Sequence, residues 1–241
     1  GAGADTLIVQ LDSVANTYDG GAGNDTVDYS ALGGNLTLVL DTDTTIGNDT
    51  IRNFEALVLG NANYTITEQG GSPFTTITTG SGTDVVTLNG DNLTTLNTGA
   101  GNDSVTVTAF NTDTAISMGA GDDSLTYATG VVNLTVAISG PLSGTVSDGS
   151  VTDTFSGVEL LTLAGGADAI SVNVNTGGMV VNAGAGADEF TVGASASNVG
   201  LIGGAGDDTF VVTYAGQSGV TLTGGTGLDT ADYSGNAVSL T

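Results

Sequence analysis

The sequence predicts an all-β protein, a parallel β-solenoid with about 20 residues per coil. Three observations predict it. A glycine-rich segment ending in aspartate recurs about every 20 residues, the residues after each aspartate alternate between apolar and polar, and the pattern runs through all 241 residues. A fixed repeat of this length is typical of a solenoid, in which each repeat buries its apolar face against its neighbours.

The repeated segment reads Gly-Gly-x-Gly-x-Asp in its clearest copy, residues 203–208. From Asp188 to Asp208 is 20 residues, and from Asp208 to Asp229 is 21. Glycine permits the positive φ angles that a tight turn needs, so each segment is predicted to form a turn. The aspartates that end the copies are Asp5, Asp25, Asp49, Asp84, Asp103, Asp123, Asp168, Asp188, Asp208 and Asp229.

Each turn is followed by a predicted strand. The second and fourth residues after the aspartate are mostly apolar, as in Val86 and Leu88, and a polar residue such as Thr87 commonly lies between them. This alternation predicts a half-buried strand of about five residues with its apolar side inward. A looser corner and a second short strand, such as residues 93–96, complete the coil.

A longer repeat is superimposed on the coils. Residues 49–55 recur 104 positions later at 153–159, and a leucine-rich strand follows each copy, at 56–59 and 160–163. We predict one continuous body of units of about 100 residues, at 1–19 (partial), 20–117, 118–223 and 224–241 (partial), excerpted from a longer array. The irregular stretches, residues 31–46, 67–77 and 128–153, are expected to be insertions that bulge from the solenoid and contact partners.

Composition narrows the function classes. The net charge is −25 and Arg52 is the only basic residue, so the chain should repel nucleic acid and attract cations. No apolar run is long enough to span a membrane. The sequence has no histidine, cysteine or lysine to serve as nucleophile or base, and the adjacent Asp207 and Asp208 would point to opposite faces of a strand. We therefore predict that the chain is not an enzyme, and we interpret Arg52 as a surface salt-bridge residue.

The turns have the composition of a site for a hard cation. Calcium takes six to eight oxygen ligands from carboxylates and backbone carbonyls, and a Gly-x-Gly-x-Asp turn supplies both. Turns stacked about 4.8 Å apart would place the aspartates in a column of like charge, which an ion shared by two turns would neutralise. The alternative is that these are metal-free solenoid turns in which the aspartate forms hydrogen bonds as an asparagine would.

These segments resemble the nonapeptide repeats of the RTX (hemolysin-type calcium-binding repeat) family, in the long-array type of secreted surface-layer and adhesin proteins. The resemblance implies a right-handed parallel β-roll whose paired turns hold Ca2+. It implies that the ten aspartates are ligands, together with backbone carbonyls of the preceding glycine-rich residues. The glycines concerned are Gly21, Gly23, Gly99, Gly101, Gly119, Gly121, Gly184, Gly186, Gly204, Gly206, Gly225 and Gly227.

The chain departs from the family pattern in one respect. Family repeats line both edges of the roll, whereas here one motif occurs per 20 residues, so we expect a single column of ions. Asn63 and the corner near Asp148 and Asp153 depart from the motif, which weakens the expectation of calcium there.

The expected function is that of a calcium-binding structural module of a secreted bacterial cell-surface protein, such as a surface layer (S-layer), an adhesin or an extracellular filament. It would fold on calcium binding outside the cell, and the resemblance implies type I secretion. Expected partners are calcium ions and either other copies of the chain, joined laterally or end to end, or cell-surface glycans. Nucleic acid and a membrane span are not expected. The alternative is an accessory RTX tail of a type I-secreted enzyme or toxin.

Overall fold

The structure is a computed structural model that describes residues 1–10, 12–89, 92–128, 133–213 and 217–235. It is all-β, as predicted, and it divides into two compact units, Gly1–Asp123 and Ser124–Thr241. Parts of the irregular stretch 128–153 and of the terminal repeat 224–241 lie outside the described residues. In the described part of the chain, no helix is long and apolar enough to cross a membrane.

The first unit contains two main parallel sheets and one small sheet. The main sheets have the strand orders β1-β3-β7-β9-β11-β13 and β4-β8-β10-β12, and the small one has the order β2-β6-β5. Within the unit only the β5–β6 pair is antiparallel among the described strand pairs. The strands are β1 Thr6–Ile8, β2 Thr17–Asp19, β3 Thr26–Tyr29, β4 Leu36–Leu40, β5 Asp43–Ile46, β6 Asp49–Arg52, β7 Ala56–Leu59, β8 Tyr64–Glu68, β9 Thr76–Thr78, β10 Val85–Leu88, β11 Thr95–Asn97, β12 Ser104–Val107 and β13 Ala115–Ser117.

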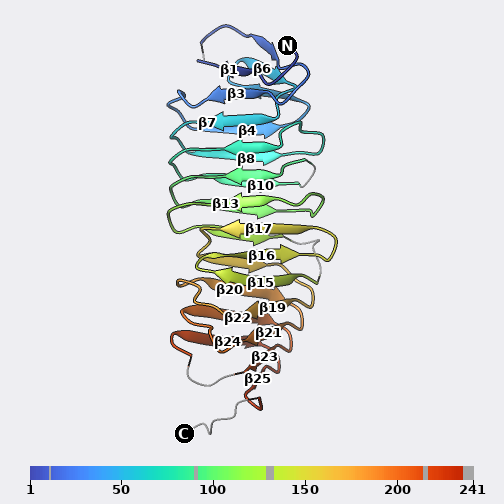
Figure 1. Cartoon of the computed structure of the whole chain (residues 1–241), viewed down its shortest axis with the longest axis vertical. Coiled ribbons are helices and arrows are strands. Elements are labelled where there is room, and N and C mark those ends of the chain that lie inside the picture. Colours follow the sequence, from blue (N-terminus) through green and yellow to red (C-terminus); the bar gives the residue numbers. More distant parts are fainter. Residues whose placement is uncertain (11, 90–91, 129–132, 214–216, 236–241) are drawn as a thin grey trace. The chain divides into compact units, whose positions relative to one another are not determined.

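The second unit has the same plan. Its sheets have the orders β17-β16-β15-β19-β21-β23-β25 and β14-β18-β20-β22-β24. Figure 1 shows β20, β22 and β24 stacked on one another, and the chain passes through β21 between β20 and β22 and through β23 between β22 and β24. The strands are β14 Ser124–Tyr127, β15 Thr135–Gly140, β16 Ser143–Ser147, β17 Thr152–Ser156, β18 Leu160–Leu163, β19 Ala169–Val172, β20 Val180–Ala185, β21 Glu189–Val192, β22 Val199–Ala205, β23 Thr209–Val212, β24 Val220–Thr226 and β25 Thr230–Asp232.

Equivalent residues of successive coils pair in register, which produces the solenoid. Val86 of β10 pairs with Val105 of β12, and Phe190 of β21 pairs with Phe210 of β23. These side chains are buried, and the two phenyl rings stack with centroids 4.6 Å apart. The alternation of the sequence thus places one side of most strands in a narrow apolar core within each unit, because side chains of a strand alternate between its faces. The first and last strands, such as β1 and β25, have no buried residue.

Two of the irregular stretches are insertions of antiparallel strands. In the first unit β5 and β6 form a hairpin between β4 and β7. In the second unit β15, β16 and β17 follow one another as antiparallel neighbours. The strands of the 128–153 stretch do not bulge from the solenoid as expected. They continue the sheet of β19 and β21, because pairing satisfies their backbone hydrogen bonds.

Candidate metal sites in the stacked aspartate turns

The motif aspartates lie inside the turns and not on the surface. Eight of the ten are at most 2% exposed, whereas Asp5 and Asp229, in the first and last described motif turns, are exposed. Burial of this kind is rare for aspartate unless the carboxylate is paired. The buried members are Asp25, Asp49, Asp84, Asp103, Asp123, Asp168, Asp188 and Asp208.

A ladder of hydrogen bonds joins the carboxylates to the backbone. In each regular pair of turns, Oδ1 of the later aspartate accepts the backbone N–H of the aspartate one coil earlier. The N–H of Asp188 donates to Asp208 Oδ1 at 2.9 Å, and that of Asp103 donates to Asp123 Oδ1 at 2.8 Å. The other such distances lie between 2.8 and 3.1 Å. One oxygen of each carboxylate is therefore held in place by the preceding coil.

The ladder continues where the chain is interrupted by insertions. Glu55 comes directly before β7, and its Oε2 accepts a hydrogen bond from the N–H of Asp25 at 2.7 Å. Asp168 Oδ1 accepts the N–H of Leu134 across 34 residues, and Asp49 Oδ1 accepts the N–H of Asn16 across 33. Sequence reasoning missed Glu55. The signal for it was an acid directly before a leucine-rich strand, the position that aspartate holds elsewhere.

The second carboxylate oxygen, Oδ2, lacks a hydrogen-bond partner in several of the described turns. Among the described residues, five motif aspartates have a buried Oδ2 without any hydrogen-bond partner: Asp25, Asp103, Asp168, Asp188 and Asp208. A buried polar atom without a partner costs about 1–3 kcal/mol, and more when it is charged. Such an atom in a native fold requires an explanation, and an ion is one of the usual ones.

The glycines of the motif are needed for two reasons. A Cβ on Gly203 would lie 2.1 Å from Asp208 Oδ2, so the first glycine makes room for the carboxylate of its own turn. Gly186 has a φ of 152°, and a Cβ there would lie 1.6 Å from the carbonyl oxygen of Gly166 in the preceding coil. All twelve glycines whose backbone carbonyls were predicted to ligate calcium have positive φ, between 88° and 156°. The carbonyl of one of them, Gly99, accepts the N–H of Ala120.

The motif aspartates of the first unit lie in more than one column, so the single motif edge on which the expected single column of ions was based is not observed there. Asp5 and Asp25 precede β1 and β3 of one main sheet, whereas Asp84 and Asp103 precede β10 and β12 of the other. Asp49 opens β6 of the small sheet. The β5–β6 hairpin adds residues between β4 and β7, so the motif returns on the other side of the coil after it.

After Glu55, threonines occupy the positions of the column that begins with Asp5 and Asp25. Thr75 and Thr94 directly precede β9 and β11, which follow β7 in the first sheet. The Thr75 hydroxyl donates to the carbonyl of Glu55 at 3.2 Å, and the Thr94 hydroxyl donates to that of Thr75 at 3.0 Å. A hydroxyl ladder of this kind carries no charge and needs no cation.

Burial and like charge raise the pKa values of three of the buried aspartates, Asp84, Asp168 and Asp188. Burial raises the pKa of Asp168 from 3.8 to about 6, and the charge of Asp188 adds to the rise, while the hydrogen bond from Leu134 opposes it. Burial likewise raises the pKa of Asp188, with a further contribution from Asp208. It also raises the pKa of Asp84, next to Asp103. At these three positions the ionised carboxylate is thus disfavoured in the absence of a counter-ion.

We expect acid to favour the folded state of the calcium-free protein. The pKa of Asp168 is higher in the folded than in the unfolded chain, so its ionised carboxylate destabilises the folded state. This destabilisation is complete above pH 6 and is lost as the pH falls through about 6 toward 4. A rise of about two pKa units corresponds to about 3 kcal/mol. Far-UV circular dichroism of dialysed protein should show more β-structure at pH 5 than at pH 7.5. The same series in calcium should lack this gain, since protons then compete with the ion; a calcium-free signal that only declines toward pH 5 would contradict the expectation.

The donor set fits a hard cation. In the described part of the chain, no three histidine, cysteine, aspartate or glutamate side chains lie close enough together to hold a metal by themselves. Five of the described turns nevertheless offer a carboxylate oxygen without a partner beside a glycine-rich backbone, and oxygen is the ligand that calcium prefers. Backbone carbonyls would have to supply most of the remaining ligands.

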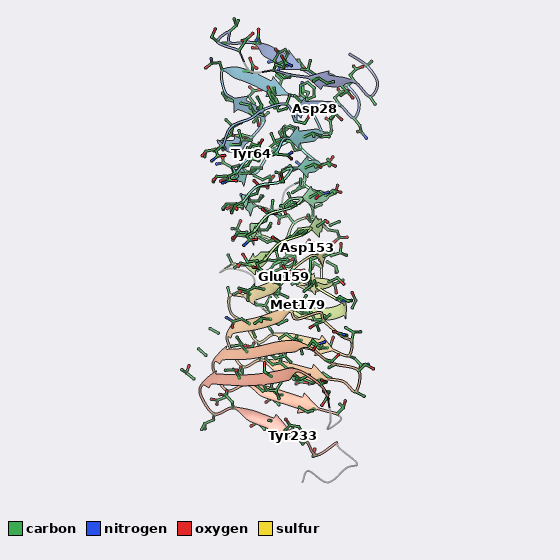
Figure 2. The ribbon with its side chains drawn as sticks, turned by 90° about the vertical axis from the view of Figure 1, so that its left-hand side faces the viewer. Asp28, Tyr64, Asp153, Glu159, Met179 and Tyr233 are labelled. Atoms are coloured by element: carbon green, nitrogen blue, oxygen red, sulfur yellow. The ribbon has the colours of Figure 1, made fainter. Side chains whose placement is uncertain are left out.

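Three residues that depart from the motif have protein partners. Asn63 Oδ1 accepts the N–H of Thr83 at 2.9 Å, and the exposed Asp148 accepts the N–H groups of Ser150 and Val151. Asp153, labelled in Figure 2, lies in β17 and accepts the buried Tyr127 hydroxyl at 3.0 Å.

The basic side chain has a structural partner. Arg52 Nε lies 3.0 Å from Asp19 Oδ2, and both side chains are partly exposed. Its interpretation as a surface salt-bridge residue is confirmed.

Comparison of the chain with models of known protein families and with curated proteins finds no match.

Proposed function

We propose that this chain is a calcium-binding structural module of the RTX type. The observation that carries the proposal is the set of buried Oδ2 atoms of Asp25, Asp103, Asp168, Asp188 and Asp208, each without a hydrogen-bond partner and each in a glycine-rich turn. A metal-free turn in which the aspartate acts like an asparagine accounts for Oδ1, which accepts a backbone N–H. It leaves Oδ2 unexplained.

The same five aspartates would hold the ion, with backbone oxygens of the glycine-rich turns. A bound calcium ion would supply positive charge to the turns of Asp168 and Asp188, where burial and a neighbouring carboxylate disfavour ionisation. The chain itself positions the ligands. The N–H of the preceding coil fixes Oδ1, and the missing Cβ of a glycine such as Gly203 leaves room for Oδ2.

Folding would then be controlled by the calcium concentration. With a net charge of −25, the calcium-free chain opposes its own compaction, and binding energy that depends on the folded turns adds directly to stability. This mechanism suits a protein exported unfolded, by type I secretion, into calcium-rich surroundings. We place it at the bacterial cell surface, in a surface layer, adhesin or filament, where other copies of the chain or glycans are its partners.

Replacing Asp188 with asparagine tests the proposal, because the effect on stability should change sign with calcium. The asparagine side chain keeps an oxygen to accept the Asp168 N–H but loses the charge. In EGTA the Asp188→Asn variant should be at least as well folded as the parent, since one ionised buried carboxylate is gone. In calcium at about 100 times the dissociation constant, loss of one site should remove about 2.7 kcal/mol. Denaturant unfolding measures the loss in calcium, and far-UV circular dichroism compares the β-structure that remains in EGTA; Asp148→Asn, at an exposed loop, is the control. Equal effects with and without calcium would count against the proposal.

A further inference from the structure

We propose that calcium occupies only some of the stacked turns, and that at Asp84 the hydroxyl of Thr79 takes the place of the cation. This inference rests on the proposed calcium-binding function and adds to it which turns bind.

Asp84 has the same place in the ladder as the other buried aspartates. Its Oδ1 accepts the N–H of Tyr64 at 2.8 Å, and its own N–H donates to Asp103 Oδ1 at 2.8 Å. Its side chain is fully buried. Its Oδ2 differs from those of the five aspartates described above, because it lies 2.5 Å from the hydroxyl oxygen of Thr79.

Thr79 is held firmly in this position. It is five residues before Asp84, where the turn of Asp208 has Gly203 and the turn of Asp188 has Ala183. Its hydroxyl also lies 2.7 Å from the carbonyl oxygen of Thr98 in the next coil. The hydroxyl therefore lies between the carboxylate of one turn and the carbonyl of the next, the groups that an ion between turns would join. Its single proton serves one acceptor at a time, and the carboxylate is at the shorter distance.

The next turn is an internal comparison. Thr98 holds the same position relative to Asp103, five residues before it, and is also fully buried. Its hydroxyl donates to the carbonyl of Met118 at 3.1 Å, and Asp103 Oδ2 has no partner. The presence of threonine thus does not decide whether the carboxylate is satisfied. Both hydroxyls face the carbonyl of the next coil, and only that of Thr79 also reaches the carboxylate of its own turn.

The neighbouring turn on the other side also lacks a free carboxylate. Before Asp84 in this column comes Tyr64, whose N–H donates to Asp84 Oδ1 and whose side chain has no carboxylate. The column in the first unit therefore passes from Tyr64, which has no carboxylate, to a carboxylate in contact with the Thr79 hydroxyl and then to the unsatisfied carboxylate of Asp103. We assign the start of calcium binding in this column to Asp103 and not to Asp84.

Counting bound ions in full-chain variants tests this assignment. Calcium equivalents would be measured by isothermal titration calorimetry and by elemental analysis of desalted protein. Asp84→Asn should bind as many equivalents as the parent, whereas Asp188→Asn should lose at least one. Thr79→Val, which keeps the shape and removes the hydroxyl, should gain one equivalent, and Thr79→Ser, which keeps the hydroxyl, should gain none.

Each outcome decides a different point. A parent that binds no calcium overturns both the proposed function and this inference. A parent that binds calcium but loses an equivalent in Asp84→Asn overturns the inference alone, and so does a folded Thr79→Val with the parental count. If Thr79→Val does not fold, Asp84→Asn and Thr79→Ser still decide, because both keep an oxygen at the positions that form hydrogen bonds.

Discussion

Removal of calcium with excess EGTA at pH 7.5 is expected to abolish the β-structure in one cooperative step. Strands about 4.8 Å apart bring successive carboxylates close together, and two charges at that distance repel by about 3 kcal/mol at an effective dielectric constant of about 20. The column from Asp168 to Asp208 contains two such neighbouring pairs, and domains of this size are stable by only about 5–15 kcal/mol. Each coil is stabilised by its neighbours, so the loss should spread.

Far-UV circular dichroism during a titration with EGTA measures this effect. Returning calcium should restore the signal, whereas magnesium should not, since it demands near-ideal octahedral geometry and gives up its water reluctantly. Raising the concentration of sodium chloride should rescue little, because buried charges are weakly screened. A spectrum that excess EGTA leaves unchanged would refute the calcium dependence.

Replacing Gly186 with alanine is expected to destabilise the calcium-bound protein by about 4 kcal/mol or more, which is at the severe end for one substitution. The φ of this residue is 152°, which disfavours a side chain, and its Cβ would lie 1.6 Å from the backbone oxygen of Gly166. A flexible side chain could move aside, but backbone in the stacked turn cannot move without breaking the hydrogen bond from Gly186 N–H to the Ala205 carbonyl.

Thermal or urea unfolding in calcium measures the loss, and Gly33→Ala is the matched control. Gly33 is exposed and a Cβ there meets nothing within 4 Å, so alanine should leave stability unchanged or raise it by about 0.4–1 kcal/mol. Comparable stability of Gly186→Ala and Gly33→Ala would show that the turns are not closely stacked.

Most of the fold could be predicted because its signals are local. The leucine-rich strands were predicted at 56–59 and 160–163 and are observed there as β7 and β18. The looser strand predicted at 93–96 is observed as β11, Thr95–Asn97, because corners vary more than motif turns. The inward positions also follow from the sequence: Val105 and Phe210, each two residues after a motif aspartate, are buried.

The site could be predicted only in part. The aspartates and the positive-φ glycines were identified correctly as elements of one turn, and their burial is a finding of the structure. The role of Glu55 and the satisfied state of Asp84 were not predicted. Glu55 acts on Asp25 from 30 residues away, beyond an insertion, and no periodic pattern marks that distance.

The sequence by itself determined the period, the alternation and the turn chemistry, because side-chain direction along a strand and the φ of glycine depend on residues next to each other. Only the tertiary structure decided which sheet each aspartate faces and which oxygen of its carboxylate lacks a partner. Those properties depend on how the insertions shift one coil against the next, and on hydrogen bonds between residues 19 or more positions apart, such as the one from Asp84 to Asp103.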